Sequence, residues 1–362
     1  MFAGSGVVSR LAKSLGFRVI CNDWEPYTRD LNGAYVGCNR RPDFASVTPG
    51  GATAVFEHLN RLDPIDGYVA VHLCPRDDRE VDARVDRQFF TRRNGRQIDA
   101  IRQKVWDWEQ AGRIDPVERH YILAALLYAV SYVSNTSGVF KGFHQGWGGA
   151  TGTALYRILS EIRLVEPVIL DNGRDNLVSS VDAQTLAGET ASLAPIVDLV
   201  YLDPPYNQHP YGSNYHVLNT VALGDKPPIG AQIEGGSDRS AIRRDWRTER
   251  RSAYNSRRDA TAALERILET LVARAILVSY STDGVIPLES MVNAACRRGE
   301  AIVLTSTYKR YRVSAQRYSK RAHNVEFVLV IDALAPANPS RAAPILETIR
   351  GEALTAQSSP DS

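Results

Sequence analysis

The chain has 362 residues, of which 44% are hydrophobic and 23% are charged, and its formal net charge is only +2. These values are typical of a soluble globular protein with one large or two modest domains, and the net charge says little about its partners. Four cysteines lie far apart without a Cys-x-x-Cys pair, which argues against a zinc site or a disulfide framework and fits a reducing cytoplasm. The longest apolar run, at 121–133, is too short for a membrane span and favours a buried helix, and no secretory signal is evident. We therefore expect a cytoplasmic protein with no metal site.

The first residues predict a nucleotide-binding turn. Residues 2–6 read Phe-Ala-Gly-Ser-Gly, a helix is expected up to Gly16, and a short strand leads to Asp23. Glycines let the backbone approach a ligand, the helix N-terminus offers unpaired N–H groups, and an acid after the strand can accept both ribose hydroxyls. The spacing from Gly6 to Asp23 is slightly shorter than in the dinucleotide fingerprint, and the third glycine is absent, so a nucleoside fits better than a pyrophosphate ligand. For the glycines alone, a helix-capping turn is the alternative.

The stretch from about 40 to 170 is predicted to be a largely helical insert. Its glycine-rich loop carries three side chains that could contact bases or could equally serve in packing: Phe143, His144 and Trp147. Helices are expected at 97–111, 116–134 and 153–163.

After the insert, strand-like runs alternate with helices, which implies a mostly parallel sheet covered on both faces. Helices are expected near 258–274 and 287–298, and strands at 198–203, 275–281, 301–308 and 325–331. From 333 onward the composition is rich in Ala, Pro and Ser, so we expect a disordered tail at 333–362.

The first of these strands leads directly into the motif Asp203, Pro204, Pro205 and Tyr206. Proline has no N–H to donate, and the residue before a proline is held extended, so this backbone is stiff and its carbonyls stay free of a ladder. A plain turn at the end of a strand is the alternative for an isolated Asp-Pro-Pro.

Taken together, these motifs resemble the Dam-like DNA adenine-N6 methyltransferases of the α group. The resemblance is carried by Phe-Ala-Gly-Ser-Gly, by Asn-Asp after the next strand, and by Asp-Pro-Pro-Tyr in the second half of the chain. The stretches at 214–221 and 308–331 are similar to the usual continuation of that family, and the similarity covers most of residues 1–331. It implies a Rossmann-like α/β methyltransferase sheet, mostly parallel with a C-terminal antiparallel hairpin. The catalytic domain would comprise 1–40 and 170–332, with 41–169 as a helical target-recognition insert.

The resemblance implies S-adenosylmethionine as the cofactor. Asp23 would bind its ribose, Trp24 would pack on its adenine unless it is a core residue, and Asp182 would contact the adenine unless it is a surface acid. The residues expected to line the rest of the pocket are Phe2, Ala3, Gly4, Ser5 and Gly6.

The resemblance also explains the stiff motif. Adenine N6 is a poor nucleophile because its lone pair is delocalised, and Asp203 together with a carbonyl of the Pro204-Pro205 unit could accept its two amino hydrogens and direct the lone pair at the methyl donor. Tyr206 would stack on the base, which must be flipped out of the duplex to be reached.

Basic side chains are the candidates for binding duplex DNA. Arginine makes up most of the 43 basic residues, a bias that a GC-rich genome would also produce. Basic clusters beside a base-flipping site suit phosphate neutralisation, with solvated loops as the alternative. The expected contacts are Arg243, Arg244, Arg250 and Arg251 in one stretch, and Lys309, Arg310 and Arg312 in another.

Two alternative functions remain. The chain could be an RNA amino-methyltransferase, because such enzymes use related motifs, or a DNA-binding protein that has lost catalysis. Because Met1 stands directly before the glycine turn, the strand that the family places there is missing, and we expect an N-terminally shortened form with weak cofactor affinity. We expect a monomer, and a cognate restriction endonuclease is left open as a partner.

Overall fold

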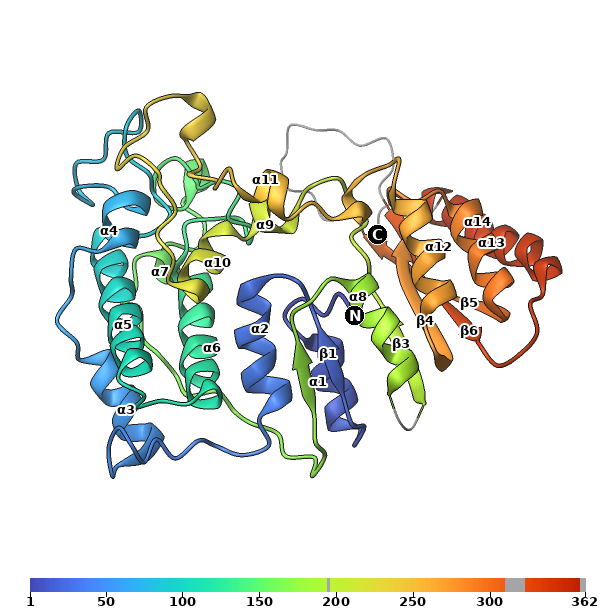
Figure 1. The fold of residues 1–362 in the computed structure, drawn as a ribbon. Helices are drawn as coiled ribbons and strands as arrows, with labels where there is room; N and C mark the ends of the chain where they lie inside the picture. Colours follow the sequence, from blue (N-terminus) through green and yellow to red (C-terminus); the bar gives the residue numbers. More distant parts are fainter. Residues whose placement is uncertain (194–195, 310–322, 359–362) are drawn as a thin grey trace.

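The computed structural model describes residues 1–193, 196–309 and 323–358, and its strands form two sheets (Figure 1). The smaller sheet pairs β1 (Ile20–Asn22) in parallel with β2 (Leu177–Ser179). The larger sheet has the order β3-β4-β6-β5 and consists of β3 (Val197–Leu202), β4 (Ala273–Ser281), β5 (Glu300–Lys309) and β6 (His323–Asp332). β3 and β4 are parallel, whereas β6 runs antiparallel to both of its neighbours.

The expectation of one mostly parallel sheet was therefore wrong, while the antiparallel hairpin of β5 and β6 is confirmed. Residues 1–3 lie between the two sheets. The Met1 nitrogen donates to the Tyr201 carbonyl of β3 at 2.8 Å, and the Ala3 nitrogen donates to the Asn22 carbonyl of β1 at 3.0 Å. One backbone hydrogen bond to each edge does not make a ladder, so β1 and β3 stay in separate sheets.

In the described residues, helices cover one face of the larger sheet and not both. Val200, Ile276, Ala301 and Ile331 lie opposite one another across the four strands and are buried. They pack against α8 (Ala183–Glu189), α12 (Ala260–Thr270), α13 (Leu288–Arg298) and α14 (Ala342–Ser358). Because successive side chains alternate between faces, Ile302 and Leu304 point the other way, and they are 46% and 60% exposed.

The insert folds into helices and loops, with no strand among residues 41–169 (Figure 1). Its helices are α3 (Gly51–Asn60), α4 (Tyr68–Leu73), α5 (Arg92–Gln110), α6 (Pro116–Val133) and α7 (Leu155–Ile158). α6 starts at a capping box in which Asp115 and Glu118 each accept the other's backbone N–H, and Pro116 stands at its first position. The helix expected at 153–163 is confined to α7, and residues 161–170 belong to no helix or strand. Ile162 and Leu164 are nevertheless buried, at alternate positions of this segment.

Five further helices surround the junction between the insert and the sheets. They are α1 (Val7–Ser14), α2 (Pro26–Asn32), α9 (Tyr211–Asn214), α10 (His216–Leu223) and α11 (Trp246–Glu249). α2 and α10 pack against α6 and share its apolar core. The insert is thereby attached to the segment that follows the Asp-Pro-Pro-Tyr motif.

The expectation of a disordered tail at 333–362 was wrong for the described residues, since α14 occupies Ala342–Ser358, and residues 359–362 lie outside the described part of the chain. α14 packs against α13 and the β5–β6 hairpin, with Ile345 and Ile349 buried at helical spacing. Burial of these two side chains offsets the low hydrophobicity of the neighbouring Ala, Pro and Ser residues. Among the described residues, no helix is long and apolar enough to cross a membrane.

Candidate functional site

Residues at the end of β1 and just beyond the ends of β2 and β3 surround one cavity of about 330 Å³. Most of the residues expected to bind the cofactor line this cavity together with the start of the Asp-Pro-Pro-Tyr motif. The lining comprises residues 2–5, 7–8, 22–25, 181–183, 203, 205, 210–212, 250, 252, 254 and 255. Segments that are far apart in the chain therefore meet at the carboxyl ends of β1 and β3.

The glycine turn is shaped by close packing on α2. Gly6 has a φ of +80°, and a Cβ at this position would lie 2.0 Å from Asn32 Oδ1, so only glycine fits. Asn32 Nδ2 donates to the Gly4 carbonyl at 3.1 Å. Gly6 itself does not border the cavity, and its role is to let the turn and α1 begin where they do.

Asp23 joins the glycine turn to the end of β1. Its carboxylate accepts the N–H of Gly4 at 2.8 Å and the N–H of Glu25 at 2.9 Å. Burial raises the pKa of Asp23, and the two backbone hydrogen bonds oppose that shift. The carboxylate is thus held at the cavity wall, where it can accept further hydrogen bonds from a ligand.

Trp24 and Asp182 lie on the same cavity, as expected. Arg250 donates to the Trp24 carbonyl at 3.0 Å, and its guanidinium lies 6.0 Å from the Trp24 ring. Asp182 caps α8 by accepting the N–H of Gln184 at 2.9 Å. A helix cap explains an aspartate at this position by itself, so the contact of Asp182 with a ligand stays a prediction.

The Asp-Pro-Pro-Tyr motif begins at the carboxyl end of β3. Asp203 and Pro205 border the cavity, and Tyr206, which follows them, is 46% exposed. Desolvation by the surrounding protein raises the pKa of Asp203 to about 6, although its side chain stays accessible from solvent. The Tyr206 carbonyl accepts the N–H of Val285 at 3.0 Å, which attaches the motif to the loop after β4.

Sequence reasoning missed Glu25, a further carboxyl group of the cavity. Asn219 Nδ2 donates to Glu25 Oε2 at 2.6 Å, and Asp23 and Arg250 are the nearest charged groups. Burial raises the pKa of Glu25 to about 7, an effect that the neighbouring Asp23 carboxylate reinforces. The tripeptide Asp-Trp-Glu shows the acid but not its burial, which depends on α9 and α10.

Glu25 predicts a pH dependence of folding stability. Since the folded protein holds this proton more tightly than the unfolded chain, the stabilisation is fully present below about pH 4.5 and is lost as the pH rises through about 7. Glu25→Gln keeps a hydrogen-bond acceptor for Asn219 and removes the titration. In urea unfolding, we expect the variant to match wild type at pH 5 and to exceed its free energy of unfolding by up to about 3 kcal/mol at pH 8. An equal difference at both pH values would contradict the assignment.

The arginines expected to contact DNA divide into two kinds. Arg244 and Arg251 are exposed. The Arg243 side chain is only 9% exposed, forms ion pairs with Asp225 and Asp245 at 2.6 Å, and stacks on Trp246 at 4.0 Å. Arg243 is therefore committed to the fold, because both of its ion-pair partners are supplied by the chain itself.

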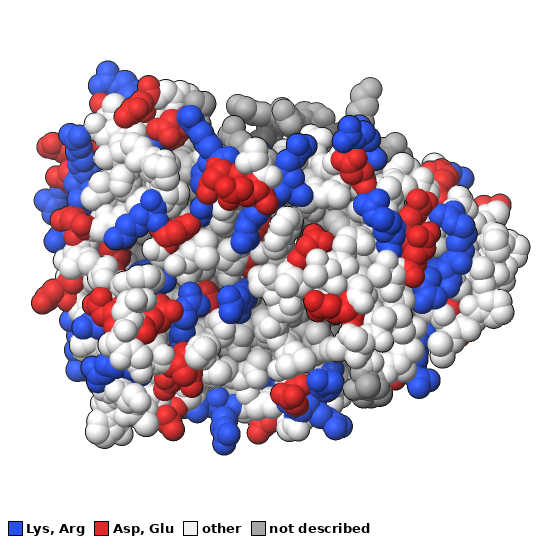
Figure 2. Space-filling model, in the orientation of Figure 1, with Lys and Arg blue, Asp and Glu red and all other residues white. Residues whose placement is uncertain are grey.

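Arg250 lines the cavity and stacks on Trp246 at 4.5 Å. Arg310 and Arg312, and the side chain of Lys309, lie outside the described residues. On the face shown in Figure 2, basic and acidic side chains are interspersed, so this face carries no patch of a single sign among the described residues.

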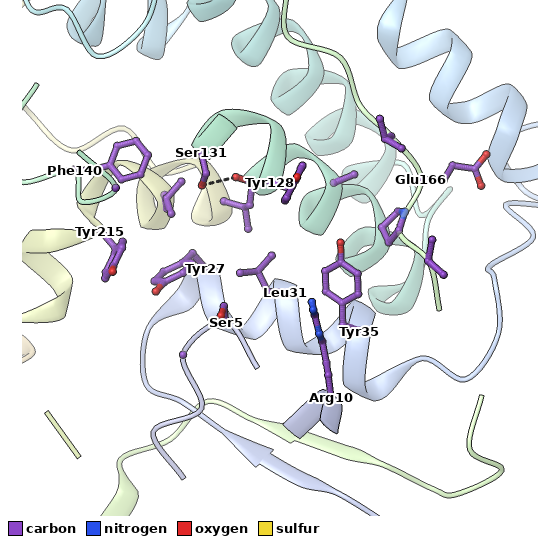
Figure 3. Close-up of a pocket in the computed structure, with 18 of the residues that line it drawn as sticks. Ser5, Arg10, Tyr27, Leu31, Tyr35, Tyr128, Ser131, Phe140, Glu166 and Tyr215 are labelled. Atoms are coloured by element: carbon purple, nitrogen blue, oxygen red, sulfur yellow. Dashed lines mark hydrogen bonds between the residues drawn. The ribbon is translucent and has the colours of Figure 1, made fainter. Parts of the chain in front are cut away.

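A second cavity of about 820 Å³ lies on the other side of the glycine turn, between α2 and α6 (Figure 3). Tyr27 and Leu31 reach it from α2 and Tyr128 from α6, and the Arg10 guanidinium lies 4.8 Å from the Tyr35 ring centroid. The two cavities share Gly4, Ser5 and Tyr211. Asp203 borders the smaller cavity and not the larger one, and Tyr206 borders neither.

Comparisons with known proteins agree with this geometry. The family model of the D12 class N6 adenine-specific DNA methyltransferases matches residues 1–232. The chain is 29% identical to the type II methyltransferase M.NlaIII of Neisseria lactamica, over 89% of this chain and 85% of that protein. It is 26% identical to the modification methylase StsI of Streptococcus sanguinis, over 81% of this chain but 41% of that protein. It is 24% identical to the type II methyltransferase M.CviAII of Paramecium bursaria Chlorella virus 1, over 92% of this chain and 89% of that protein.

No solved structure matches the chain. The family match includes the glycine turn, Asp23 and the complete Asp-Pro-Pro-Tyr motif, and it covers more than half of the chain. The matching family model is that of DNA methyltransferases, which supports the expectation of DNA and not RNA as the substrate. The chain therefore belongs to the D12 class N6 adenine-specific DNA methyltransferase family and is a site-specific adenine methyltransferase acting on DNA.

Proposed function

We propose that the methyl donor is S-adenosylmethionine and that its nucleoside end occupies the cavity of about 330 Å³. This volume lies at the lower end of the range of ligand pockets, roughly 300–1,000 Å³. The residues that line the cavity fit this cofactor. Asp23 offers carboxylate oxygens that can accept hydrogen bonds from the ribose hydroxyls, Trp24 offers an aromatic face for the adenine ring, and the glycine turn lets the backbone lie close to the ligand. Since the larger cavity shares Gly4 and Ser5, an elongated ligand can extend past them into it.

We infer that the two sheets are parts of a Rossmann-like methyltransferase arrangement. In open α/β sheets, ligands bind beyond the carboxyl ends of the strands. Here β1 ends at Asn22, next to Asp23, and β3 ends at Leu202, next to Asp203. Both carboxyl ends thus open onto the same cavity.

The reaction would proceed at the edge of this cavity through Asp203. S-adenosylmethionine supplies an electrophilic methyl group when bound. Asp203 would accept one N6 hydrogen of the target adenine, and a carbonyl of the Pro204-Pro205 unit would accept the other, which directs the nitrogen lone pair at the donor. The Asp203 carboxylate, which is ionised above a pH of about 6, would take the proton that N6 loses as it gains the methyl group. The stiff backbone would hold this arrangement without reorganisation.

The observation that supports this function best is the meeting of Asp23 and Asp203 at one cavity, although they come from opposite halves of the chain. The test is to incubate the protein with plasmid DNA and S-adenosylmethionine and to map modified adenines by long-read sequencing. We expect N6-methyladenine at one recurrent sequence, with RNA of the same sequence unable to compete. If the protein binds DNA but does not methylate it, the alternative function, a DNA-binding protein without catalysis, would be favoured.

Tyr206 is proposed to stack on the flipped adenine. Tyr206→Ala should therefore lower the methylation rate more than Tyr206→Phe, because the ring and not the hydroxyl makes the contact. Stacking of one base on an aromatic ring contributes about 1–3 kcal/mol, which corresponds to roughly a five- to 150-fold difference between the two variants. Single-turnover rates with a duplex oligonucleotide measure it. Equal impairment of both variants would assign the role to the hydroxyl group.

Arg244 and Arg251 are proposed to contact DNA phosphates, and the insert at 41–169 is proposed to select the target sequence. Replacing both arginines by glutamine should weaken binding to all sequences and reduce the slope of log affinity against log salt by up to about 2. Target choice should not change, since phosphate contacts carry no base information.

The matched control for this prediction is the pair Arg18→Gln and Arg174→Gln, which lie outside the insert. Both residues are exposed and come shortly before β1 and β2, so they lie at the amino ends of these strands and not at the carboxyl ends that border the cavity. An unchanged salt slope in the Arg244 and Arg251 variant, or an equal change in the control, would show that these arginines do not contact DNA and only lie on a solvated loop.

A further inference from the structure

The backbone after the Asp-Pro-Pro-Tyr motif depends on side chains from elsewhere in the chain. Residues 203–210 belong to no helix or strand. Asn255 Nδ2 donates to the Asn207 carbonyl at 2.7 Å and to the His209 carbonyl at 3.3 Å. One amide group therefore connects two carbonyls of the loop that begins directly after Tyr206.

Asn255 is held by a rigid support. It ends the short 3-10 helix η5 (Ala253–Asn255), in which the Ser252 hydroxyl accepts the N–H of Tyr254 at 3.3 Å. Tyr254 is 3% exposed, and its hydroxyl donates to the Ala263 carbonyl of α12 at 3.2 Å. The same hydroxyl accepts a hydrogen bond from Gln184 of α8 at 3.1 Å. Asn255 thus connects the loop to the helices that cover the larger sheet.

The support also borders the expected cofactor site. The Tyr254 ring packs edge-on against Phe2, with ring centroids 4.9 Å apart, and Gln184 closely follows Asp182 in the chain. Asn255 itself borders the cavity together with Asp203. A displacement of the loop relative to this support would therefore move the acceptor groups of the motif relative to the methyl donor.

We propose that Asn255 is a positioning residue for methyl transfer, which holds residues 207–209 so that Asp203 and Tyr206 face the donor in a reactive geometry. This proposal rests on the function proposed above for Asp203. A misplacement of reacting groups by about 1 Å costs on the order of a hundredfold in rate. The two hydrogen bonds of Asn255 hold residues that directly follow the motif, so a small backbone shift at these residues would also move Asp203 and Tyr206.

Asparagine is suited to this task because its amide nitrogen carries two hydrogens, one for each carbonyl. The isosteric replacement Asn255→Asp would present an ionised carboxylate to two carbonyl oxygens and repel them. A protonated carboxyl group can donate one hydrogen bond, so the defect of this variant should lessen at low pH. A loss of general stability would show no such recovery.

The experiment compares Asn255→Ala and Asn255→Asp with wild type and with Asn39→Ala. Asn39 provides the matched control, since its Nδ2 donates to the Arg174 carbonyl at 2.7 Å and it does not border the cavity. The measurements are the single-turnover methylation rate, the dissociation constant of S-adenosylmethionine by calorimetry, and amide hydrogen exchange of the peptide covering 203–213.

For both Asn255 variants we expect at least a tenfold lower rate, an S-adenosylmethionine affinity within about threefold of wild type, and faster exchange in the 203–213 peptide. The rate of Asn255→Asp relative to wild type should rise at least fivefold from pH 8 to pH 5.5, and Asn39→Ala should change none of these quantities. Rates within twofold of wild type, or a loss of cofactor affinity as large as the loss of rate, would overturn the proposal. If wild type itself fails to methylate DNA, the proposed function is wrong. Unchanged hydrogen exchange in the variants would show that Asn255 does not hold the loop after Tyr206, and this outcome does not depend on the proposed function.

Discussion

Asp203→Ala should lower the rate of methyl transfer to less than a tenth of wild type and leave the affinity for S-adenosylmethionine within about threefold. The carboxylate acts on the target base, whereas Asp23 and the glycine turn act on the donor, so the two properties should separate. A tenfold loss corresponds to about 1.4 kcal/mol of transition-state stabilisation, less than a charge-assisted hydrogen bond contributes at its strongest. Single-turnover kinetics measure the rate of methyl transfer, and calorimetry measures the affinity for S-adenosylmethionine. A variant that retains more than a tenth of the rate would rule out Asp203 as the acceptor.

The pH profile gives an independent test of the same residue. Because the pKa of Asp203 is raised to about 6, the wild-type single-turnover rate should fall as the pH decreases through this value and the carboxylate becomes protonated. Asp203→Asn keeps an acceptor oxygen without a charge, so any residual activity should lack this titration. The control is the pH dependence of DNA binding, which should not follow the same curve. A rate that is constant from pH 5 to pH 8 would contradict this role.

Asp23→Ala should weaken the binding of S-adenosylmethionine at least tenfold and lower the rate at limiting cofactor accordingly. The variant removes the proposed acceptor for the ribose hydroxyls and leaves the N–H groups of Gly4 and Glu25 without their carboxylate. Each unpaired buried group costs about 1–3 kcal/mol, so the glycine turn should also lose its fixed conformation. Isothermal calorimetry measures the loss of affinity.

Asp182→Ala is the matched control for Asp23, since Asp182 borders the same cavity and also accepts a backbone N–H. We expect the larger loss of affinity from Asp23→Ala, because its carboxylate connects β1 to the glycine turn, whereas Asp182 caps a single helix. Saturation of Asp23→Ala by high cofactor concentrations should restore much of the rate. A rate that stays low at saturation would place Asp23 in the chemical step instead.

Several elements of the site were predictable from local sequence because local rules determine them. Proline prevents the ladder beyond Leu202, the strand β3 ends where Asp203 begins the motif, and Gly6 adopts the positive φ that starts α1. The capping box at Asp115 likewise marks the start of α6. In each case the deciding contacts lie within a few residues of one another.

Charge and composition were poorer guides, since their effect depends on distant partners. Arg243 was expected to bind DNA, but Asp225 neutralises it from a separate segment, and Arg250 turns toward Trp24, which lies near the start of the chain. Ala, Pro and Ser suggested disorder at the C-terminus, yet Ile345 and Ile349 are enough to bury α14 against the hairpin. Neither outcome can be derived from a window of sequence.

By itself, the sequence determined the chemistry of this protein: an acid and a stiff Pro-Pro unit at the end of one strand, a glycine turn with an acid after another, and hence the family. Only the tertiary structure decided that these two acids share one cavity, that Glu25 is half-buried beside them, and that Asn255 connects to the loop after Tyr206. The physical reason is that backbone turns follow from steric limits on adjacent residues, whereas burial and hydrogen-bond partners follow from the packing of elements far apart in the chain.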